Sequence, residues 1–253
     1  MMATGKISAL VTGASSGIGA EFCRQLAERC EVIIAVGRRE VELQALAAEL
    51  SAKVEVHCVI ADLTTVEGQT RVIETLRQKG PVDYLVNNAG FSTLGAFSEL
   101  DLAPQQAMVE LHITAPMALC RAAIPFMRER GGGFIINVSS LVTFGAHPMV
   151  AVYGASKVFL NHFSEALQQE LADTGIKVQS LCPGYTRSDF HGRDSMQGFD
   201  AAMVPESMWM EADEVVRISL AELAGDQVVV VTGAGNQSLA STGLEGQIKR
   251  LQG

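Results

Sequence analysis

Three side chains in the second half of the chain have the types and spacing needed for proton transfer. Tyr153 and Lys157 are four residues apart, so on a helix they share one face. An ammonium beside a phenol favours the phenolate and lowers the tyrosine pKa from about 10. Ser140, which ends a strand-like run, offers a second hydroxyl to the same oxygen. Together they predict a proton donor to a carbonyl oxygen; a solvated helix pair is the alternative for Tyr153 and Lys157 alone.

A glycine-rich turn near the N-terminus predicts a phosphate site. Residues 12–19 read Thr-Gly-Ala-Ser-Ser-Gly-Ile-Gly and follow an apolar run directly. Glycines let the backbone turn sharply and approach a pyrophosphate, and the helix that follows presents free N–H groups and a partial positive charge. The alternative is a tight strand-to-helix turn that holds no ligand. The predicted cofactor-binding residues here are Gly13, Ser15, Ser16, Gly17, Ile18 and Gly19.

The end of the second apolar run bears on which dinucleotide is bound. In dinucleotide-binding folds an acidic residue near this point holds the adenosine ribose hydroxyls. Gly37 occupies that position here, and Arg38 and Arg39 follow it. Without the carboxylate there is less repulsion of a phosphate, and a guanidinium suits a phosphate group. These residues predict NADP(H) as the preferred cofactor and NAD(H) as a possible one; a solvated arginine pair before an acidic helix start is the alternative.

Taken in order, these motifs resemble the short-chain dehydrogenase/reductase family over about residues 5–233. The resemblance implies that Ser140 polarises the substrate carbonyl and that Tyr153 is the general acid in reduction or the general base in oxidation. It implies that Lys157 binds the nicotinamide ribose. Other positions match cofactor-contacting motifs of the family: Asp62 and Leu63, then Asn87, Asn88, Ala89 and Gly90, then Pro183, Gly184, Thr186 and Ser188.

One position departs from the family pattern. Relatives carry an asparagine in the fourth helix that helps to hold a water on the proton relay to the lysine, and His112 stands there instead. A histidine can also hold that water, and its titration near pH 6.5 would make the relay sensitive to pH. The alternative is a tolerated histidine, with a backbone carbonyl holding the water. His112 completes the predicted catalytic set.

The elements that must position these residues alternate along the chain. Short apolar runs without strict alternation are typical of parallel strands covered on both faces, and segments of helical periodicity separate them. The pattern predicts one α/β domain over residues 1–253, a Rossmann-like doubly wound fold with a seven-stranded parallel sheet flanked by helices on both faces. The predicted strands are 7–12, 32–36, 54–60, 84–86, 134–138, 178–181 and 228–232, and the predicted helices are 17–29, 39–51, 65–79, 103–130, 151–173 and 211–224.

Two segments fall outside this alternation. A long irregular stretch at about 186–210 is predicted to be a substrate lid, because such loops inside a domain are often functional. Its sulfur-rich cluster either adapts to an apolar ligand or fills the core under the loop; the cluster is Met196, Met203, Met208, Trp209 and Met210. A polar C-terminal tail is predicted at about 234–253, in place of the glycine-rich ending that supports tetramers in many relatives.

Composition narrows the class of protein. The 253 residues carry a formal charge of −9, and only 19% are charged, against about 25% in an average globular protein. No run reaches the roughly 18–20 continuous apolar residues of a spanning helix, so we expect a cytoplasmic protein without a membrane partner. The negative charge disfavours nucleic acid as a partner. The histidines and the five cysteines share no metal-ligand spacing, so we expect no metal and reduced, buried thiols.

These features predict an NADPH-dependent carbonyl reductase, or an alcohol dehydrogenase in the reverse direction. Hydride would pass between the nicotinamide and a ketone, aldehyde or secondary alcohol. One alternative is an NAD-dependent dehydrogenase acting oxidatively. Another is a dinucleotide-sensing binding protein without chemistry, which would be expected to lose the tyrosine or the lysine. The family resemblance also implies a homodimer or homotetramer built on the long fourth and fifth helices.

Overall fold

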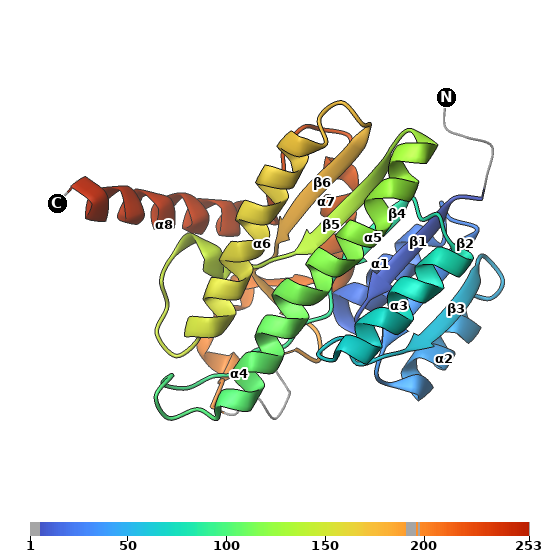
Figure 1. The fold of residues 1–253 in the computed structure, drawn as a ribbon. Coiled ribbons are helices and arrows are strands. Elements are labelled where there is room, and N and C mark those ends of the chain that lie inside the picture. The colour runs from blue at the N-terminus through green and yellow to red at the C-terminus, as the bar shows by residue number, and fades with distance from the viewer. Residues whose placement is uncertain (1–5, 191–195, 197, 253) are drawn as a thin grey trace.

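Seven strands form one parallel sheet in the order β3-β2-β1-β4-β5-β6-β9 (Figure 1). The computed structural model describes residues 6–190, 196 and 198–252. Each predicted run coincides with a strand, and the bounds differ by at most two residues. The strands are β1 Ser8–Thr12, β2 Val32–Gly37, β3 Glu55–Ile60, β4 Tyr84–Asn87, β5 Gly133–Val138, β6 Ile176–Cys182 and β9 Val229–Val231.

Helices cover both faces of this sheet, which confirms the predicted doubly wound Rossmann-like class. On one face α1, α2 and α7 bury side chains such as Phe22 and Leu43. On the other, α3, α5 and α6 bury side chains such as Val72 and Leu119. The helices are α1 Gly17–Leu26, α2 Glu40–Leu50, α3 Val66–Lys79, α4 Leu102–Val109, α5 Ala115–Arg130, α6 Ala151–Glu170, α7 Ala212–Glu222 and α8 Ala234–Gln252.

The helix expected over 103–130 is divided by a wider turn. Between α4 and α5, Glu110–Thr114 forms one turn of π-helix. The interruption lies just before Pro116, which has no N–H and whose ring crowds the carbonyl four residues earlier. Pro125 lies inside α5 without ending it. Gly131, in a left-handed conformation at φ +79°, ends α5 after residue 130, which is the predicted end of this helix.

The same region also has the length and composition of a membrane span. Among the described residues, the helical stretch Leu102–Arg130 reaches a mean hydropathy of 1.3 over 18 residues, although it contains no continuous apolar run of that length. In the structure its second half lies along the sheet, and Leu119, Cys120, Ala123 and Met127 are fully buried. Packing against the sheet therefore accounts for its apolar character.

The predicted lid and tail both contain regular structure. Tyr185–Arg187 and Trp209–Glu211 form β7 and β8, a small parallel pair outside the main sheet. Part of the predicted lid, residues 191–195 and 197, lies outside the described residues. The expected polar tail is helix α8, whose outer turns project away from the body of the protein (Figure 1).

Candidate active site

The carboxyl ends of the central strands open onto one cavity. The sheet order reverses between β1 and β4, and open α/β sheets bind ligands in the crevice at such a point. A cavity of about 570 Å³ lies there. It collects most of the residues that the sequence singles out: Gly13, Ser16, Gly17, Ile18, Asn88, Ala89, Gly90, Ser140, Tyr153, Lys157, Pro183, Gly184, Thr186 and Ser188.

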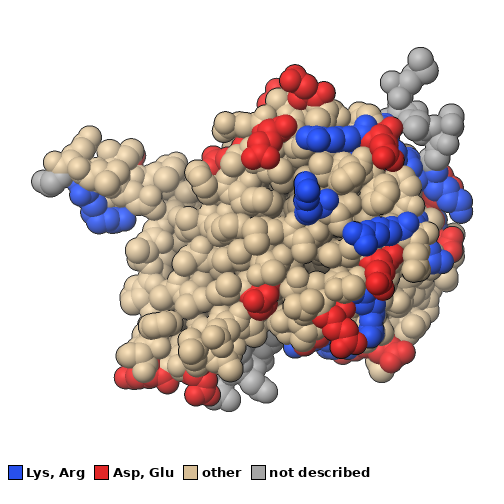
Figure 2. All heavy atoms as spheres, viewed as in Figure 1, with Lys and Arg blue, Asp and Glu red and all other residues tan. Residues whose placement is uncertain are grey.

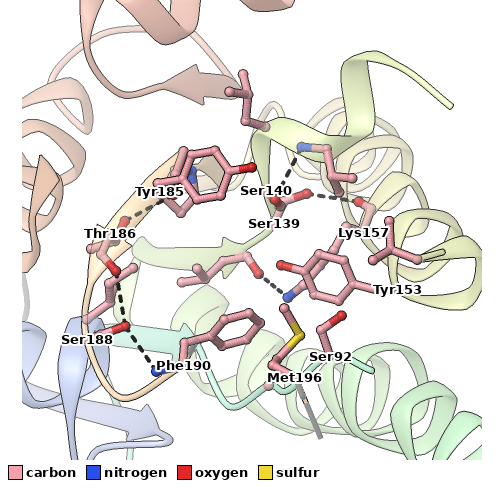
Figure 3. A pocket seen from close by; sticks show the side chains of 18 of the residues that line it. Ser92, Ser139, Ser140, Tyr153, Lys157, Tyr185, Thr186, Ser188, Phe190 and Met196 are labelled. Atoms are coloured by element: carbon pink, nitrogen blue, oxygen red, sulfur yellow. Dashed lines mark hydrogen bonds between the residues drawn. The ribbon is translucent and has the colours of Figure 1, made fainter. Parts of the chain in front are cut away.

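Ser140, Tyr153 and Lys157 come together in this cavity (Figure 3). Ser140 follows β5 and begins the short 3-10 turn Leu141–Phe144, while the other two lie in the first turns of α6. Lys157 Nζ is 5.7 Å from the centroid of the Tyr153 ring. The same ammonium nitrogen donates a hydrogen bond of 2.8 Å to the backbone oxygen of Val138. Neighbouring strand and helix ends thus produce the predicted arrangement.

Burial dominates the electrostatics of this group. It raises the pKa of Tyr153 to about 12, although a hydrogen bond with Ser140 favours the phenolate. It also lowers the pKa of Lys157 to about 7. The expectation that Lys157 lowers the tyrosine pKa is therefore wrong in this structure, because desolvation of the phenolate outweighs any help from an ammonium bonded to the backbone. Tyr153 keeps its proton at neutral pH.

His112 is buried behind the loop that follows β4, with 1% of its surface exposed. Its Nδ1 lies 2.9 Å from Ser156 Oγ, and that hydroxyl donates to the backbone oxygen of Tyr153. Since the serine has one hydrogen to donate, Nδ1 carries the imidazole hydrogen. Nε2 is then free to accept the N–H of Phe91 at 3.3 Å.

This environment corrects the expected titration of His112. Burial, with a smaller contribution from the charge of Lys157, holds its pKa well below the usual 6.5. The ring is therefore neutral across the physiological range, and switching of a proton relay near pH 6.5 is wrong for this protein. Its hydrogen bonds tie the loop after β4 to α6, which is a structural role for the histidine.

The glycine-rich turn is packed too closely to admit side chains. Gly13 and Gly17 have φ angles of +66° and +53°. A Cβ on Gly19 would lie 2.2 Å from the backbone oxygen of Gly13. Asn88 closes the turn by donating its side-chain amide to the backbone oxygen of Thr12 at 2.9 Å. The turn therefore leaves the N-terminus of α1 open to the cavity.

A second cavity of about 290 Å³ adjoins the first and shares Gly13, Ala89 and Gly90 with it. This cavity is lined by six further residues predicted to bind the cofactor: Ser15, Gly37, Arg38, Arg39, Asp62 and Leu63. Gly19 and Asn87 line neither cavity, because Gly19 packs within its turn and Asn87 is buried, where it donates to Asn137 Oδ1 at 2.8 Å. No acidic side chain stands at the end of β2, as expected from Gly37.

Arg38 and Arg39 both line this second cavity. Arg39 donates to Ser15 Oγ at 3.1 Å and to Ser16 Oγ at 2.6 Å, both in the glycine-rich turn. Arg38 lies 3.8 Å from a carboxylate oxygen of Asp62. Burial opposes ionisation of Asp62, but hydrogen bonds from Thr64 and the Arg38 charge outweigh it, so the Asp62 pKa is lowered. Two guanidinium groups and the hydroxyls of Ser15 and Ser16 therefore lie together at this end of the glycine-rich turn.

The chain belongs to the short-chain dehydrogenase/reductase family. It matches the family model for short chain dehydrogenase over residues 8–197. A sulfoacetaldehyde reductase from Chromohalobacter salexigens is 35% identical over 184 residues, which is 72% of this chain and 73% of that protein. As a family member, this chain is an oxidoreductase of the NAD(P)-dependent class.

Two solved structures of similar proteins cover nearly the whole chain. A short-chain dehydrogenase from Sphingobium yanoikuyae in complex with NADPH is 33% identical, with a TM-score of 0.83 over 96% of this chain and 95% of that one. A bulky-bulky ketone specific alcohol dehydrogenase from Comamonas testosteroni is 30% identical, with a TM-score of 0.79 over 96% of this chain and 94% of that one.

The outer part of this short-chain dehydrogenase's cavity is apolar. Met196 and Met208 line it, whereas Met203 is 81% exposed and Met210 packs against the core. Met196 and Met208 thus fit the predicted ligand-lining role and Met210 the core-filling one, whereas the exposed Met203 fits neither. Other apolar side chains complete the wall: Leu94, Val142, Phe144, Phe190, Phe199 and Leu239.

Sequence reasoning missed two groups at this site. Ser156 lies between Tyr153 and Lys157 in sequence, and its contact with His112 was not anticipated. Leu239 and Gly243 of α8 line the cavity, although the sequence predicts only a polar tail there. Apolar residues spaced by three and four along 240–251 were the available signal for a helix there. Among the described residues, no group of three or more His, Cys, Asp or Glu side chains could hold a metal.

Proposed function

We propose that this protein is an NADPH-dependent carbonyl reductase that also oxidises the corresponding alcohol. One observation carries the proposal: Tyr153 and Ser140 line the cavity beside the glycine-rich turn, and burial raises the pKa of Tyr153 to about 12. A general acid must hold its proton before reaction. A phenol that is protonated at neutral pH is in the state that a general acid needs when it donates to a carbonyl oxygen during reduction.

The residues present fit a nicotinamide dinucleotide. The close approach of Gly13, Gly19 and Asn88 leaves backbone N–H groups of α1 available to a pyrophosphate. Asp62 and Leu63 line the second cavity and would hold the adenine, while Thr186 and Ser188 line the first cavity. When bound, the cofactor supplies the hydride.

Each member of the catalytic group has a separate task in this proposal. Ser140 donates a hydrogen bond to the substrate carbonyl and orients it. Tyr153 transfers its phenolic proton to the same oxygen. Lys157, placed between Val138 and the tyrosine ring, binds the nicotinamide ribose and helps to restore the proton. His112 acts through its neighbours, since its neutral ring holds the backbone at Phe91.

The preference for NADPH rests on the arginines beside the second cavity. Arg38 and Arg39 reach toward it with Ser15, and Gly37 adds no carboxylate. A 2′-phosphate would accept charge-assisted hydrogen bonds there. The similarity to an NADPH-bound dehydrogenase supports the same assignment.

The apolar outer wall supports a bulky, uncharged carbonyl substrate. Relatives described as a sulfoacetaldehyde reductase and a bulky-bulky ketone specific alcohol dehydrogenase act on carbonyl or alcohol groups. We also propose that the segment at about 186–210 covers the substrate and that the protein is a homo-oligomer. The face over the first halves of α5 and α6 shows few charged side chains (Figure 2), and Met117 in α5 and Val158 in α6 are exposed.

The experiment is a panel of ketones and aldehydes assayed by NADPH and NADH oxidation. We expect turnover with NADPH and tighter binding of NADPH than of NADH. Tyr153→Phe should lower kcat by about 10²–10⁴-fold while NADPH still binds, and Tyr84→Phe, a change in β4, should not. Full activity of Tyr153→Phe would refute the mechanism. Tight NADPH binding without turnover on the whole panel would favour a dinucleotide-binding protein.

A further inference from the structure

The segment that follows β7 passes beside the glycine-rich turn. Ser188 and Phe190, which belong to it, lie along one side of the first cavity (Figure 3). A Cβ on Gly17 would lie 2.9 Å from Cβ of Ser188, so the segment is in close contact with the start of α1. Two residues later, the centroid of the Phe190 ring is 6.0 Å from that of Tyr153. Residues 188–190 therefore connect the glycine-rich turn with the catalytic tyrosine.

Asp189, in the middle of this segment, contacts an arginine of the second cavity. Its Oδ2 accepts a hydrogen bond of 3.4 Å from Arg39 Nη1. The Nη2 group of the same guanidinium donates to the hydroxyls of Ser15 and Ser16 at 3.1 Å and 2.6 Å. Its Nε lies 3.7 Å from a carboxylate oxygen of Glu42, which is three residues further along the chain. Arg39 is thus held both by the glycine-rich turn and by a carboxylate 150 residues later in sequence.

The two arginines of the second cavity differ in the carboxylates that they meet. Arg38 lies beside Asp62, which lines the cavity itself. Asp189 lines neither cavity, so no role in the cofactor site accounts for its contact with Arg39. The Arg39 and Asp189 side chains are 40% and 60% exposed. Because an ion pair this exposed to water is weak, another anion can displace the carboxylate.

We propose that Asp189 sets the discrimination between NADPH and NADH by competing with the 2′-phosphate for Arg39. The inference rests on the proposed function, in which Arg38 and Arg39 bind this phosphate. A guanidinium suits a phosphate because its N–H donors match the phosphate oxygens in pairs. The carboxylate occupies one of these donors, Nη1, before the cofactor binds. NADH has no phosphate at this position, so its binding does not involve the exchange.

The opposite role, in which Asp189 orients Arg39 for the phosphate, fits the contacts less well. Ser15 and Ser16 already fix the guanidinium through two of its three nitrogens, Nε and Nη2. Nη1 is the nitrogen that these hydroxyls leave to a ligand, and it is the one that Asp189 accepts from. Removing the carboxylate therefore frees a donor without loosening the arginine.

Fluorescence titration of the full chain with NADPH and with NADH tests the inference. Asp189→Asn should tighten NADPH binding by about two- to fivefold, the effect of one exposed ion pair, and change NADH binding by less than about twofold. The gain should shrink in about 0.5 M salt, which screens exposed charges. Asp173→Asn makes the same change of charge in the turn between α6 and β6 and should alter neither affinity. Because both side chains are exposed, circular dichroism should show an unchanged fold.

Two further titrations locate the effect at Arg39. In an Arg39→Ala background, Asp189→Asn should have little effect on NADPH binding, because the contested group is gone. Adenosine 2′,5′-bisphosphate, which has the phosphate but no nicotinamide, should show the same gain as NADPH. Unchanged or weaker NADPH binding by Asp189→Asn would overturn this inference alone. Equal affinity of the wild type for NADPH and NADH would instead refute the NADPH preference, and this inference with it.

Discussion

Replacing His112 by glutamine should change how the stability of the protein depends on pH. Burial holds the pKa of this histidine well below 6.5 in the folded state, so the unfolded chain binds the proton more readily. Stability is then lost as the pH falls through the unfolded-state pKa of about 6.5. Between about pH 7.5 and about pH 5.5, one such proton costs about 1.4 kcal/mol of unfolding free energy. Glutamine has no proton to take up, so the variant should lack this loss.

The assay is urea denaturation of both proteins at the two pH values. The wild type should lose about 1.4 kcal/mol more than His112→Gln between them. His162→Gln removes an exposed histidine from α6 and should behave as the wild type. If His112→Gln loses as much stability as the wild type on acidification, the buried neutral imidazole is refuted. Glutamine can still accept the N–H of Phe91, which limits the loss at the higher pH.

Three further changes test other parts of the site. Gly19→Ala places a Cβ 2.2 Å from the Gly13 oxygen and should destabilise the protein by about 1–3 kcal/mol, seen in thermal unfolding, and weaken NADPH binding. Arg38→Ala should weaken NADPH binding about tenfold or more while changing NADH binding little, measured by fluorescence titration. Ser156→Ala leaves the Nδ1 hydrogen of His112 unpaired and should cost about 1–3 kcal/mol in urea denaturation.

The fold was predictable because its signals are local. The apolar run at Val32–Gly37 has the length of a buried strand. The glycines of residues 13–19 mark the turn that precedes α1 and begins it. The meeting of Ser140 with Tyr153 also follows from sequence order, since the end of β5 and the start of α6 lie at one edge of a parallel sheet.

The electrostatics were not predictable in the same way. The pKa of Tyr153 depends on how many neighbours exclude water from it, and those neighbours come from several distant segments. The state of His112 depends on Ser156, which lies 44 residues away in sequence. The spacing of four residues places Lys157 on the same face of α6 as Tyr153. It does not show that the Lys157 ammonium donates a hydrogen bond to the backbone oxygen of Val138.

The π turn at Glu110–Thr114 acts as a one-residue insertion into an otherwise regular helix. Each residue of an α-helix turns the chain by about 100°, so the extra residue rotates α5 by that amount relative to α4. His112 lies inside this insertion. Deleting one residue from it would give a longer and more regular helix, yet it would put the imidazole and the apolar face of α5 out of phase with each other. The irregular turn thus allows one continuous helical segment to bury the apolar face of α5 against the sheet while His112 contacts the loop beside the cavity.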